Sequence, residues 1–305
     1  MTKISIIIPC YNSAKFVSRA IESVIDQTFQ DWEILLVNNN STDNTQEVLE
    51  KYAHLYPQKI RVFQESKKGA PLARNKGLTE AKGDWVQFLD ADDEILPDKL
   101  MGQYELAINK GVSIVAGLYT MIGISNNTYV NTTRGLGDDD LWVALVKSNL
   151  GITSANLFNK DLLVKVGGWD ENLIASQEYD LMFRMLKHSD AVAYDYRKMT
   201  IIHLEIGDSI SRGGGNERRQ LILDSKIALR LRIREYLEEQ DLLTKKRRYL
   251  IDQFIYRTLI KNYRYWPDTI LIKLKNINLN ILLTDKIKGK LFMHKMNLKR
   301  FLVGN

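Results

Sequence analysis

The chain of 305 residues contains one cysteine, five prolines and no long apolar run. Because Cys10 has no second cysteine to pair with, an internal disulfide is excluded and a reducing compartment is expected. The apolar segment at residues 4–8 is too short for the core of a signal peptide and is typical of a buried strand. No segment approaches the roughly 20 apolar residues that cross a bilayer. The sequence therefore predicts a cytoplasmic protein that does not span a membrane.

Two phosphate-binding signatures are also absent. There is no Walker loop, and no Gly-x-Gly-x-x-Gly follows the first apolar segment, so kinase and dinucleotide-binding functions have no phosphate cradle. What the chain does contain, 45% hydrophobic and 26% charged residues, is the composition of a globular protein.

The net charge of +6 is unevenly distributed along the chain. Residues 1–215 contain 22 Lys/Arg and 28 Asp/Glu, whereas residues 216–305 contain 21 and 9. A glycine-rich segment at 211–216 separates them. We therefore predict two regions, a first domain at 1–212 and a basic, mainly helical region at 213–305.

Strand and helix signals alternate along the first 120 residues. Such alternation predicts a sheet of parallel strands covered by helices, with ligands bound at the carboxyl ends of the strands. Further on, helices are expected near 139–148 and 178–188. The expected strands are residues 4–8, 33–37, 60–64, 85–89, 112–119 and the segment near 191–203.

Three carboxylates, Asp90, Asp92 and Asp93, follow the fourth expected strand. Carboxylates this close repel one another unless a cation or a partner compensates. Oxygen ligands of this kind suit Mg²⁺ or Mn²⁺, which complete their shells with phosphates and water. The alternative is an acidic turn that caps the helix after Pro97, and the residues themselves leave both interpretations open.

Five segments in order together resemble the family 2 glycosyltransferases. The resemblance implies the GT-A fold, a Rossmann-like α/β arrangement with a mixed, mostly parallel sheet flanked by helices, here with a C-terminal helical extension. It also implies inversion at the anomeric carbon, a nucleotide-sugar donor and Mn²⁺ or Mg²⁺ as cofactor. It covers about two-thirds of the chain, residues 3–212. The segments are Ser-Ile-Ile-Ile-Pro-Cys-Tyr-Asn at 5–12, Gln-Thr-Phe at 27–29, Val-Asn-Asn-Asn-Ser-Thr-Asp at 37–43, Ala-Arg-Asn-Lys-Gly at 73–77 and Phe-Leu-Asp-Ala-Asp-Asp at 88–93.

The resemblance places donor contacts in the first half of the chain. Pro9 and Tyr11 match positions that line the nucleotide pocket. Asn39 stands where the family usually has an acidic residue that accepts a hydrogen bond from uracil, and an amide oxygen retains that ability. Arg74 matches a position near the donor phosphates, and the alternative for it is a surface salt bridge.

The same resemblance assigns the acidic cluster and two later residues. Asp90 is expected near the ribose or sugar, Asp92 on the metal, and Asp93 at the sugar or behind the metal ligands. His203 is expected to complete the metal or diphosphate site, with a structural histidine as the alternative. Arg212 would neutralise the leaving diphosphate when its glycine-rich loop closes.

Residues 175–184 resemble the family segment Glu-Asp-x-Asp-Leu-x-x-Arg, whose second acid is the catalytic base. Glu178 falls at that position, while Gln177 replaces the first acid. Inversion needs a carboxylate that takes the proton from the acceptor hydroxyl. Asp180 is expected to be structural or to bind the acceptor, and Trp169 to be a sugar-stacking platform or a buried aromatic.

The C-terminal region mixes aliphatic residues with a basic cluster at 245–248. Basic helices with apolar faces suit the surface of an anionic membrane, so we expect a peripheral contact with the inner face of the cell membrane. The alternative is a helical appendage packed on the catalytic domain. There is no nucleic-acid recognition motif beyond the charge, and no nucleic-acid partner is expected.

We therefore expect an inverting, metal-dependent hexosyl- or N-acetylhexosaminyltransferase. It would move a sugar from a nucleotide-sugar, a UDP-sugar by preference, to a glycan or lipid-linked glycan in cell-surface polysaccharide synthesis. One alternative is a metal-dependent nucleotidyltransferase, which would need a triphosphate cradle that residues 9–12 do not provide. The other is a decayed, glycan- or membrane-binding relative, against which the intact Asp92 and Glu178 argue.

Overall fold

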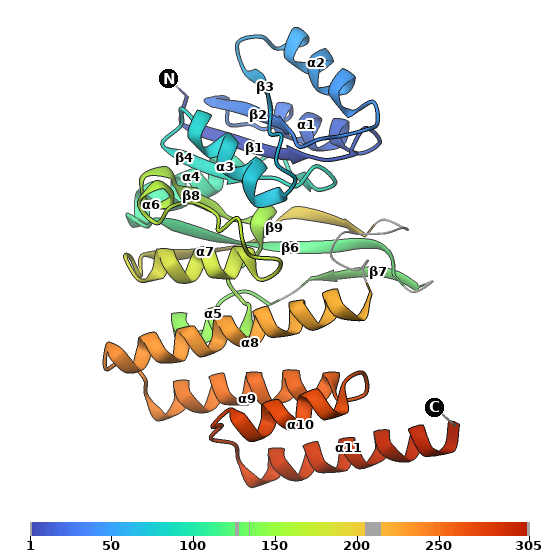
Figure 1. Cartoon of the computed structure of the whole chain (residues 1–305). Coiled ribbons are helices and arrows are strands. Elements are labelled where there is room, and N and C mark those ends of the chain that lie inside the picture. Colours follow the sequence, from blue (N-terminus) through green and yellow to red (C-terminus); the bar gives the residue numbers. More distant parts are fainter. Residues whose placement is uncertain (1, 126–127, 134, 205–214, 304–305) are drawn as a thin grey trace. The chain divides into compact units, whose positions relative to one another are not determined.

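A computed structural model of the chain describes residues 2–125, 128–133, 135–204 and 215–303 (Figure 1). The chain forms two compact units. The first comprises Met1–Asp138, Ser148–Leu173 and Gln177–Gly213, and the second Asp139–Lys147, Ile174–Ser176 and Gly214–Asn305. The helical unit thus includes a short segment from the middle of the chain that the sequence did not assign to it. The predicted boundary at residue 212 lies outside the described residues.

The first unit is built on a nine-stranded sheet in the order β3-β2-β1-β4-β8-β6-β9-β5, with β7 paired to β6. The strands β3, β2, β1 and β4 are mutually parallel, as predicted. Beyond them β8 runs antiparallel to both β4 and β6, so the sheet becomes mixed. The strands are β1 (Ile4–Cys10), β2 (Trp32–Asn38), β3 (Ile60–Gln64), β4 (Trp85–Phe88), β5 (Glu94–Ile95), β6 (Ile114–Ser125), β7 (Thr128–Thr133), β8 (Leu157–Asn159) and β9 (Val192–Leu204).

Helices cover both faces of this sheet because successive side chains of a strand point to opposite sides. Ile6 and Ile8 of β1 pack in a cluster with α1, α2 and α4, whereas Ile7 meets α3 on the other side. Gly77 makes that second contact possible, since a Cβ there would lie 2.4 Å from Ile7 Cγ2. The helices are α1 (Val17–Ile25), α2 (Thr45–Leu55), α3 (Ala70–Glu80), α4 (Lys99–Lys110), α6 (Lys160–Lys165), α7 (Gln177–Leu186) and the short 3₁₀ helix η1 (Thr153–Ala155).

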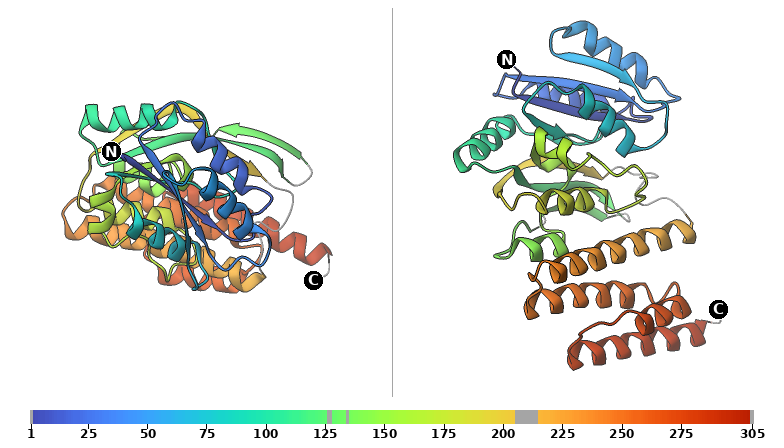
Figure 2. Two further views of the ribbon diagram at one scale, coloured as in Figure 1. Left: turned by 90° about the horizontal axis from the view of Figure 1, so that it is seen from above. Right: turned by 60° about the vertical axis from the view of Figure 1, so that its left-hand side comes forward.

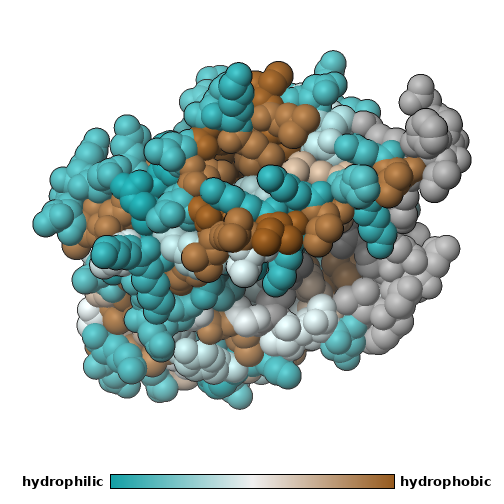
Figure 3. Space-filling view, turned by 90° about the horizontal axis from the view of Figure 1, so that it is seen from below, coloured by the Kyte–Doolittle hydropathy of each residue, from teal (hydrophilic) through white to brown (hydrophobic). Residues whose placement is uncertain are grey.

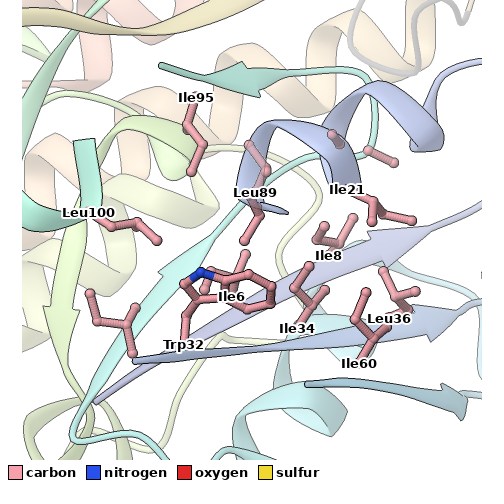
Figure 4. Packing of buried hydrophobic residues seen from close by; sticks show 14 of the residues in the cluster. Ile6, Ile8, Ile21, Trp32, Ile34, Leu36, Ile60, Leu89, Ile95 and Leu100 are labelled. Carbon is pink, nitrogen blue, oxygen red and sulfur yellow. The ribbon is translucent and has the colours of Figure 1, made fainter. Parts of the chain in front are cut away.

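The main core lies on the α1 side of the sheet (Figure 4). Side chains of β1, β2 and α1 pack together there. Trp32 lies at the start of β2, and Leu89 and Ile95 come from the residues that follow β4. Ile6, Ile8 and Ile34 are fully buried, and each such side chain contributes about 1.5–3 kcal/mol. The apolar strands that the sequence indicated therefore fix the sheet, and the sheet fixes where its polar strand ends lie.

Those strand ends meet at one edge. Cys10 at the end of β1 stands opposite Asn38 at the end of β2. On the other side of β1, Ile7 pairs with Phe88, and the amide of Leu89 donates to the Ile7 carbonyl at 3.0 Å. The polar segments that follow these three parallel strands are consequently neighbours.

The second unit is helical. It contains α5 (Leu141–Lys147), α8 (Asn216–Glu239), α9 (Lys245–Asn262), α10 (Pro267–Asn276) and α11 (Leu283–Val303) (Figure 2). Helix α9 packs against the other four. Two buried polar groups tie the helices together: Arg230 donates to the Val146 carbonyl at 3.0 Å, and Arg234 pairs with Asp252 at 2.6 Å. Among the described residues, no helix combines the length and apolarity that crossing a membrane requires.

Candidate active site

The acidic turn after β4 is held by a serine from far along the chain. Ser154 of η1 accepts a hydrogen bond from the Asp90 amide at 3.1 Å and donates to the Asp93 carboxylate at 2.5 Å. The turn closes on itself through the Asp93 amide, which donates to the Asp90 carbonyl at 3.0 Å. Asp93 is only 4% exposed, so it supports the turn from beneath. Nothing in the sequence linked Ser154 to this turn, because 61 positions separate it from Asp93.

The electrostatics of this turn are unfavourable for the folded chain. Burial, and then the charges of Asp90 and Asp92, raise the pKa of Asp93 well above its usual range. Because this pKa is higher in the folded than in the unfolded chain, the folded state binds more protons at any pH between the two values. Ionisation of Asp93 therefore costs stability, and this cost is relieved as the pH falls from the folded pKa toward the unfolded one. Strain of this kind is typical of functional sites.

Arg74 connects the turn to α3. Its guanidinium pairs with Asp90 at 2.7 Å and lies over the ring of Trp169, 4.6 Å from the ring centroid. Arg74 is 7% exposed, whereas the Asp90 side chain is 38% exposed. Because Arg74 is buried, the pair is not the surface salt bridge considered from the sequence. It is a buried cation that orients a half-exposed carboxylate.

Trp169 is 2% exposed and packs edge-on against Phe88, with ring centroids 5.1 Å apart. Its backbone is clamped by Asn75 of α3, which accepts from the Trp169 amide at 2.8 Å and donates to its carbonyl at 2.9 Å. This placement favours the buried aromatic over the sugar platform. Three residues of the Ala-Arg-Asn-Lys-Gly segment thus have distinct contacts. Arg74 pairs with Asp90 of the turn, Asn75 holds the backbone of Trp169, and Gly77 leaves room for Ile7 of β1.

Asp92, the predicted metal ligand, is exposed. Its carbonyl accepts from the guanidinium of Arg19 on α1 at 2.5 Å. This contact fixes the backbone that carries the Asp92 carboxylate. Arg19 was missed from the sequence because it lies on the amphipathic helix after β1, 73 residues earlier.

Strand pairing brings His203 close to Glu94, which follows the acidic turn. Strand β9 runs antiparallel to β5 with Glu94 opposite Ile201, two residues before His203. The His203 Nε2 is 3.5 Å from the Glu94 carboxylate, and within the described part of the chain it has no hydrogen-bond partner although it is buried. Glu94 was not recognised from the sequence.

These groups fit a divalent cation of the kind that phosphates help to coordinate. The described residues include no group of three or more His, Cys, Asp or Glu side chains that could hold a metal ion alone. The exposed carboxylate of Asp92 and the imidazole of His203, whose Nε2 lies 3.5 Å from Glu94, would instead be an incomplete donor set. Mg²⁺ or Mn²⁺ commonly completes such a set with phosphate oxygens.

The segment after β1 forms a second wall of the strand-end edge. Pro9 and Tyr11 are partly exposed there. Lys68, from the segment before α3, donates to the Tyr11 hydroxyl at 2.9 Å, and its ammonium lies 4.4 Å from the ring centroid. Lys68 therefore adds a positive charge that the sequence analysis did not include. Cys10, between Pro9 and Tyr11, is buried. Burial raises the pKa of its thiol to about 12 and keeps the thiol unreactive.

Asn39 has a defined structural task. Its amide nitrogen donates to the carbonyls of Glu65 and Lys67 at 3.0 and 2.7 Å, and its oxygen accepts from the Gly69 amide at 2.7 Å. A carboxylate cannot donate, so only an amide can make all three bonds. This accounts for asparagine where the family usually has an acid. Asn39 is 3% exposed and shapes the loop that carries Lys68.

The predicted base lies in the first turn of α7. Glu178 is partly exposed, and its neighbour Tyr179 donates to the Gly151 carbonyl at 2.8 Å. Three residues beyond Gly151, Ser154 holds the acidic turn. One short segment, residues 151–154, thus anchors both the carboxylates after β4 and the helix that carries Glu178.

Asp180 points elsewhere. It is 1% exposed and pairs with Arg184 at 2.8 Å. Arg184 in turn donates to the carbonyls of Val166 and Gly168, both at 2.7 Å. This placement favours the structural alternative for Asp180 over acceptor binding. Arg212 lies outside the described residues.

Behind the acidic turn lies a buried lysine that the sequence analysis did not single out. The Lys99 ammonium, fully buried on α4, donates to the side-chain oxygens of Gln87 and Gln103, the latter at 2.8 Å. The two glutamines donate to the carbonyls of Ser154 and Ala155, each at 2.9 Å. Desolvation lowers the pKa of Lys99 to about 7, with Asp195 acting against the shift. Lys99 therefore braces η1 from below.

The fold defines the class of protein. The chain has the GT-A fold, as predicted. It superimposes with a TM-score of 0.63 and 16% identity on Staphylococcus aureus TarS in complex with UDP-GlcNAc, covering 97% of this chain and 80% of that one. For the mannosyltransferase PcManGT from Pyrobaculum calidifontis, in complex with GDP-Man and Mn²⁺, the TM-score is 0.57 at 15% identity, covering 99% and 88%. At these identities the likeness concerns the fold alone.

The sequence then defines the family. The profile of glycosyl transferase family 2 matches residues 5–167, more than half of the chain, so the chain belongs to this family, as predicted. An uncharacterized glycosyltransferase of Nostoc sp., alr2836, is 45% identical over 170 residues, covering 54% of this chain and 53% of its own. TuaG of Bacillus subtilis, a glycosyltransferase named for teichuronic acid biosynthesis, is 32% identical over 140 residues, covering 45% and 56%. The chain thus spans about half the length of these relatives.

Proposed function

We propose that this glycosyltransferase transfers a sugar with inversion from a nucleotide-sugar donor to a glycan or lipid-linked glycan acceptor in cell-surface polysaccharide synthesis. The observation that carries the proposal is the shared anchoring of the acidic turn and of Glu178 by residues 151–154. Donor and base must face the same anomeric carbon from opposite sides, and a common anchor keeps that distance constant. TarS, solved with UDP-GlcNAc, supports a UDP-sugar of the hexosyl or N-acetylhexosaminyl class as the first donor to test.

The residues divide the reaction between them. Tyr11 and Lys68 would hold the nucleotide, and Asp90, oriented by Arg74, would bind the ribose or sugar. Glu178 would take the proton of the acceptor hydroxyl while the hydroxyl oxygen bonds to the anomeric carbon. The bond from that carbon to the diphosphate breaks on the opposite face, and its electron pair leaves with the nucleoside diphosphate.

The leaving diphosphate needs positive charge. Asp92 and His203 are the residues that would hold Mn²⁺ or Mg²⁺, which, when bound, neutralises the diphosphate as a Lewis acid. The complexes of PcManGT with Mn²⁺ and GDP-Man and of GalNAc-T7 with Mn²⁺, UDP and GalNAc support this choice of cofactor. Arg212 is proposed to add charge from the part of the sequence that follows His203.

The test is release of nucleoside diphosphate from a panel that includes UDP-GlcNAc, UDP-glucose and GDP-mannose, with Mn²⁺ or with EDTA. We expect turnover of a UDP-sugar that EDTA abolishes. Asp92→Asn should weaken the apparent affinity for Mn²⁺ at least ~10-fold, because it removes a direct ligand and loss of an outer-shell partner alone costs about 10–100-fold. The matched control is Asp84→Asn, which removes a 67% exposed carboxylate at the opposite end of β4.

Failure of every donor to bind or turn over would refute the transferase proposal. Turnover that EDTA leaves unchanged would refute the metal. Release of pyrophosphate from a nucleoside triphosphate and sugar phosphate, in place of nucleoside diphosphate from the donor, would identify a nucleotidyltransferase instead.

A further inference from the structure

Helix α11 carries a row of exposed aliphatic side chains along its outer face. Leu283, Ile287, Leu291 and Leu298 are 72%, 48%, 64% and 49% exposed. At about 100° of rotation per residue, the four fall within a sector of about 80° on the helix surface. We call this row the α11 stripe. A monomeric soluble protein rarely leaves such a row of large apolar side chains exposed without a use for it.

The opposite face of α11 is turned toward α9. Asp285 is 8% exposed and accepts hydrogen bonds from Tyr249 and Gln253 of α9 at 2.9 and 2.8 Å. Gly289 approaches Tyr256 so closely that a Cβ would lie 2.1 Å from its hydroxyl oxygen. The rotation of α11 is therefore fixed, and no described residue covers the stripe side. Figure 3, viewed from the side on which α11 lies, shows apolar side chains gathered among hydrophilic ones.

Lysines border the stripe on both sides. By the same helical rotation, Lys286 and Lys290 lie along one edge and Lys288 and Lys295 along the other, and all four are exposed. The only acidic residue of α11 is Asp285, which faces inward. The outer face of the helix thus presents apolar side chains and positive charge, with no negative charge among them.

The basic cluster at 245–248 is differently placed. Arg247 pairs with Asp140 at 2.8 Å, and Arg248 pairs with Glu238. These two charges are therefore engaged within the helical unit, and the cluster that stands out in the sequence is not the strongest candidate for a lipid contact. The lysines of α11 alternate with unburied leucines, which is the arrangement that an interface between water and hydrocarbon selects.

We propose that α11 lies in the plane of an anionic lipid membrane, with the α11 stripe in the acyl boundary and its lysines at the lipid phosphates. Long lysine side chains bury their methylenes while the ammonium stays at the headgroups. A second copy of the chain fits the same face less well. Two stripes packed together would bring four lysines from each helix close to one another without an acidic partner, and like charges at an interface disfavour association.

The test is co-sedimentation of the full chain with vesicles of phosphatidylcholine alone or with 30% phosphatidylglycerol added. We expect binding to the anionic vesicles that falls as salt is raised. The variant Leu283→Ser/Ile287→Ser/Leu291→Ser should bind at least ~10-fold more weakly, because it removes the apolar insertion. Lys286→Gln/Lys288→Gln/Lys290→Gln should lose up to roughly 100-fold on anionic vesicles.

The matched control is Leu55→Ser/Val164→Ser, which removes two aliphatic side chains, each 60% exposed, from the sheet unit. It should bind vesicles like the unmodified chain. Circular dichroism melts show whether each variant is folded. Nucleoside diphosphate release with a water-soluble acceptor should be unchanged in the serine triple variant, so failure of the membrane proposal and failure of the proposed function are distinguishable.

Equal vesicle binding by the folded triple variant and the unmodified chain would overturn the proposal. So would binding that is indifferent to phosphatidylglycerol. A dimer in sedimentation that the triple variant converts to monomer, with no vesicle binding, would assign the stripe to a second copy.

Discussion

The two units of this protein depart from an ordinary globular fold in different places. In the sheet unit, charged groups such as Arg74, Asp93 and Lys99 are buried just behind the strand ends. In the helical unit, large aliphatic groups such as Leu283 and Leu291 are exposed. Each departure costs stability relative to an ordinary globular fold. The buried charges therefore mark the proposed active site of the sheet unit, and the exposed aliphatic groups mark the proposed membrane contact of the helical unit.

Buried polar groups also differ in what they hold. In the helical unit, Asp252 accepts from Arg234 of α8 at 2.6 Å and from the Asn280 amide at 2.9 Å, so it joins helices and their connection. In the sheet unit, Lys99 and Ser154 converge on one turn. Buried polar groups in the helical unit thus maintain the packing, whereas in the sheet unit they position a site.

The largest expected effect is on turnover. Glu178→Gln removes the proposed proton acceptor but keeps the size of the side chain, so kcat should fall about 10²–10⁴-fold while donor affinity and thermal stability stay the same. Single-turnover kinetics and calorimetric titration with donor measure the two quantities. Glu47→Gln makes the same change in the first turn of α2, at an exposed position, and should leave kcat unaltered. Retained turnover in the Glu178 variant would move the base elsewhere.

The second prediction concerns the stability of the helical unit alone. Asp252→Ala removes the buried carboxylate that accepts from the partly buried Arg234 and from the Asn280 amide, and it should destabilise the helical unit by about 3 kcal/mol. Hydrogen exchange measured by mass spectrometry should show faster exchange in α8–α11, while donor affinity is unchanged.

Asp268→Ala is the control, because Asp268 is exposed in the first turn of α10 and should contribute at most about 1 kcal/mol. If the Asp252 variant lost donor affinity as well as stability, the stability of the helical unit would be coupled to donor binding by the sheet unit.

The smallest effect concerns pH. The pKa of Lys99 is about 7 in the folded chain and 10.5 in the reference state, so between these values the unfolded chain binds more protons and stability rises with pH. Lys99→Met lacks this titration. The free energy of unfolding of the unmodified chain minus that of Lys99→Met should therefore be roughly 2 kcal/mol larger at pH 8.5 than at pH 6.

Urea unfolding at the two pH values measures this difference. Lys110→Met, at the exposed end of the same helix, should shift stability equally at both. A pH-independent difference for Lys99→Met would mean that the buried lysine keeps an ordinary proton affinity.

Much of the sheet unit was predictable because its signals are local. Apolar runs of strand length fixed β1 to β4, and polar residues directly after them marked the edge where Tyr11, Asn39 and Asp92 lie. Strands β5, β7 and β8 were not among the expected strands. Strands β5 and β8 have only two and three residues, and β7 is polar, Thr-Tyr-Val-Asn-Thr-Thr, so none of them carries a clear hydrophobic period.

Supporting residues were harder to find than site residues. Ser154 meets Asp93 across 61 positions, and Arg19 meets Asp92 across 73. A serine or an arginine has no local pattern that reports a partner so far away. Lys99 looked like one more surface lysine after a proline, since burial of a charge follows from what packs around it and not from its neighbours in the chain.

The sequence by itself determined the family, the class of fold and the identity of the polar groups at the strand ends, because each is written in the order and spacing of short segments. Only the tertiary structure decided the tasks of those groups. It set the hydrogen-bond partners of Asn39 and Asp93, paired Arg74 with Asp90, and turned the leucines and lysines of α11 outward while Asp285 faced α9. The physical reason is that hydrogen bonding and burial depend on distance in space, which the chain sets only once the sheet and the helices have packed.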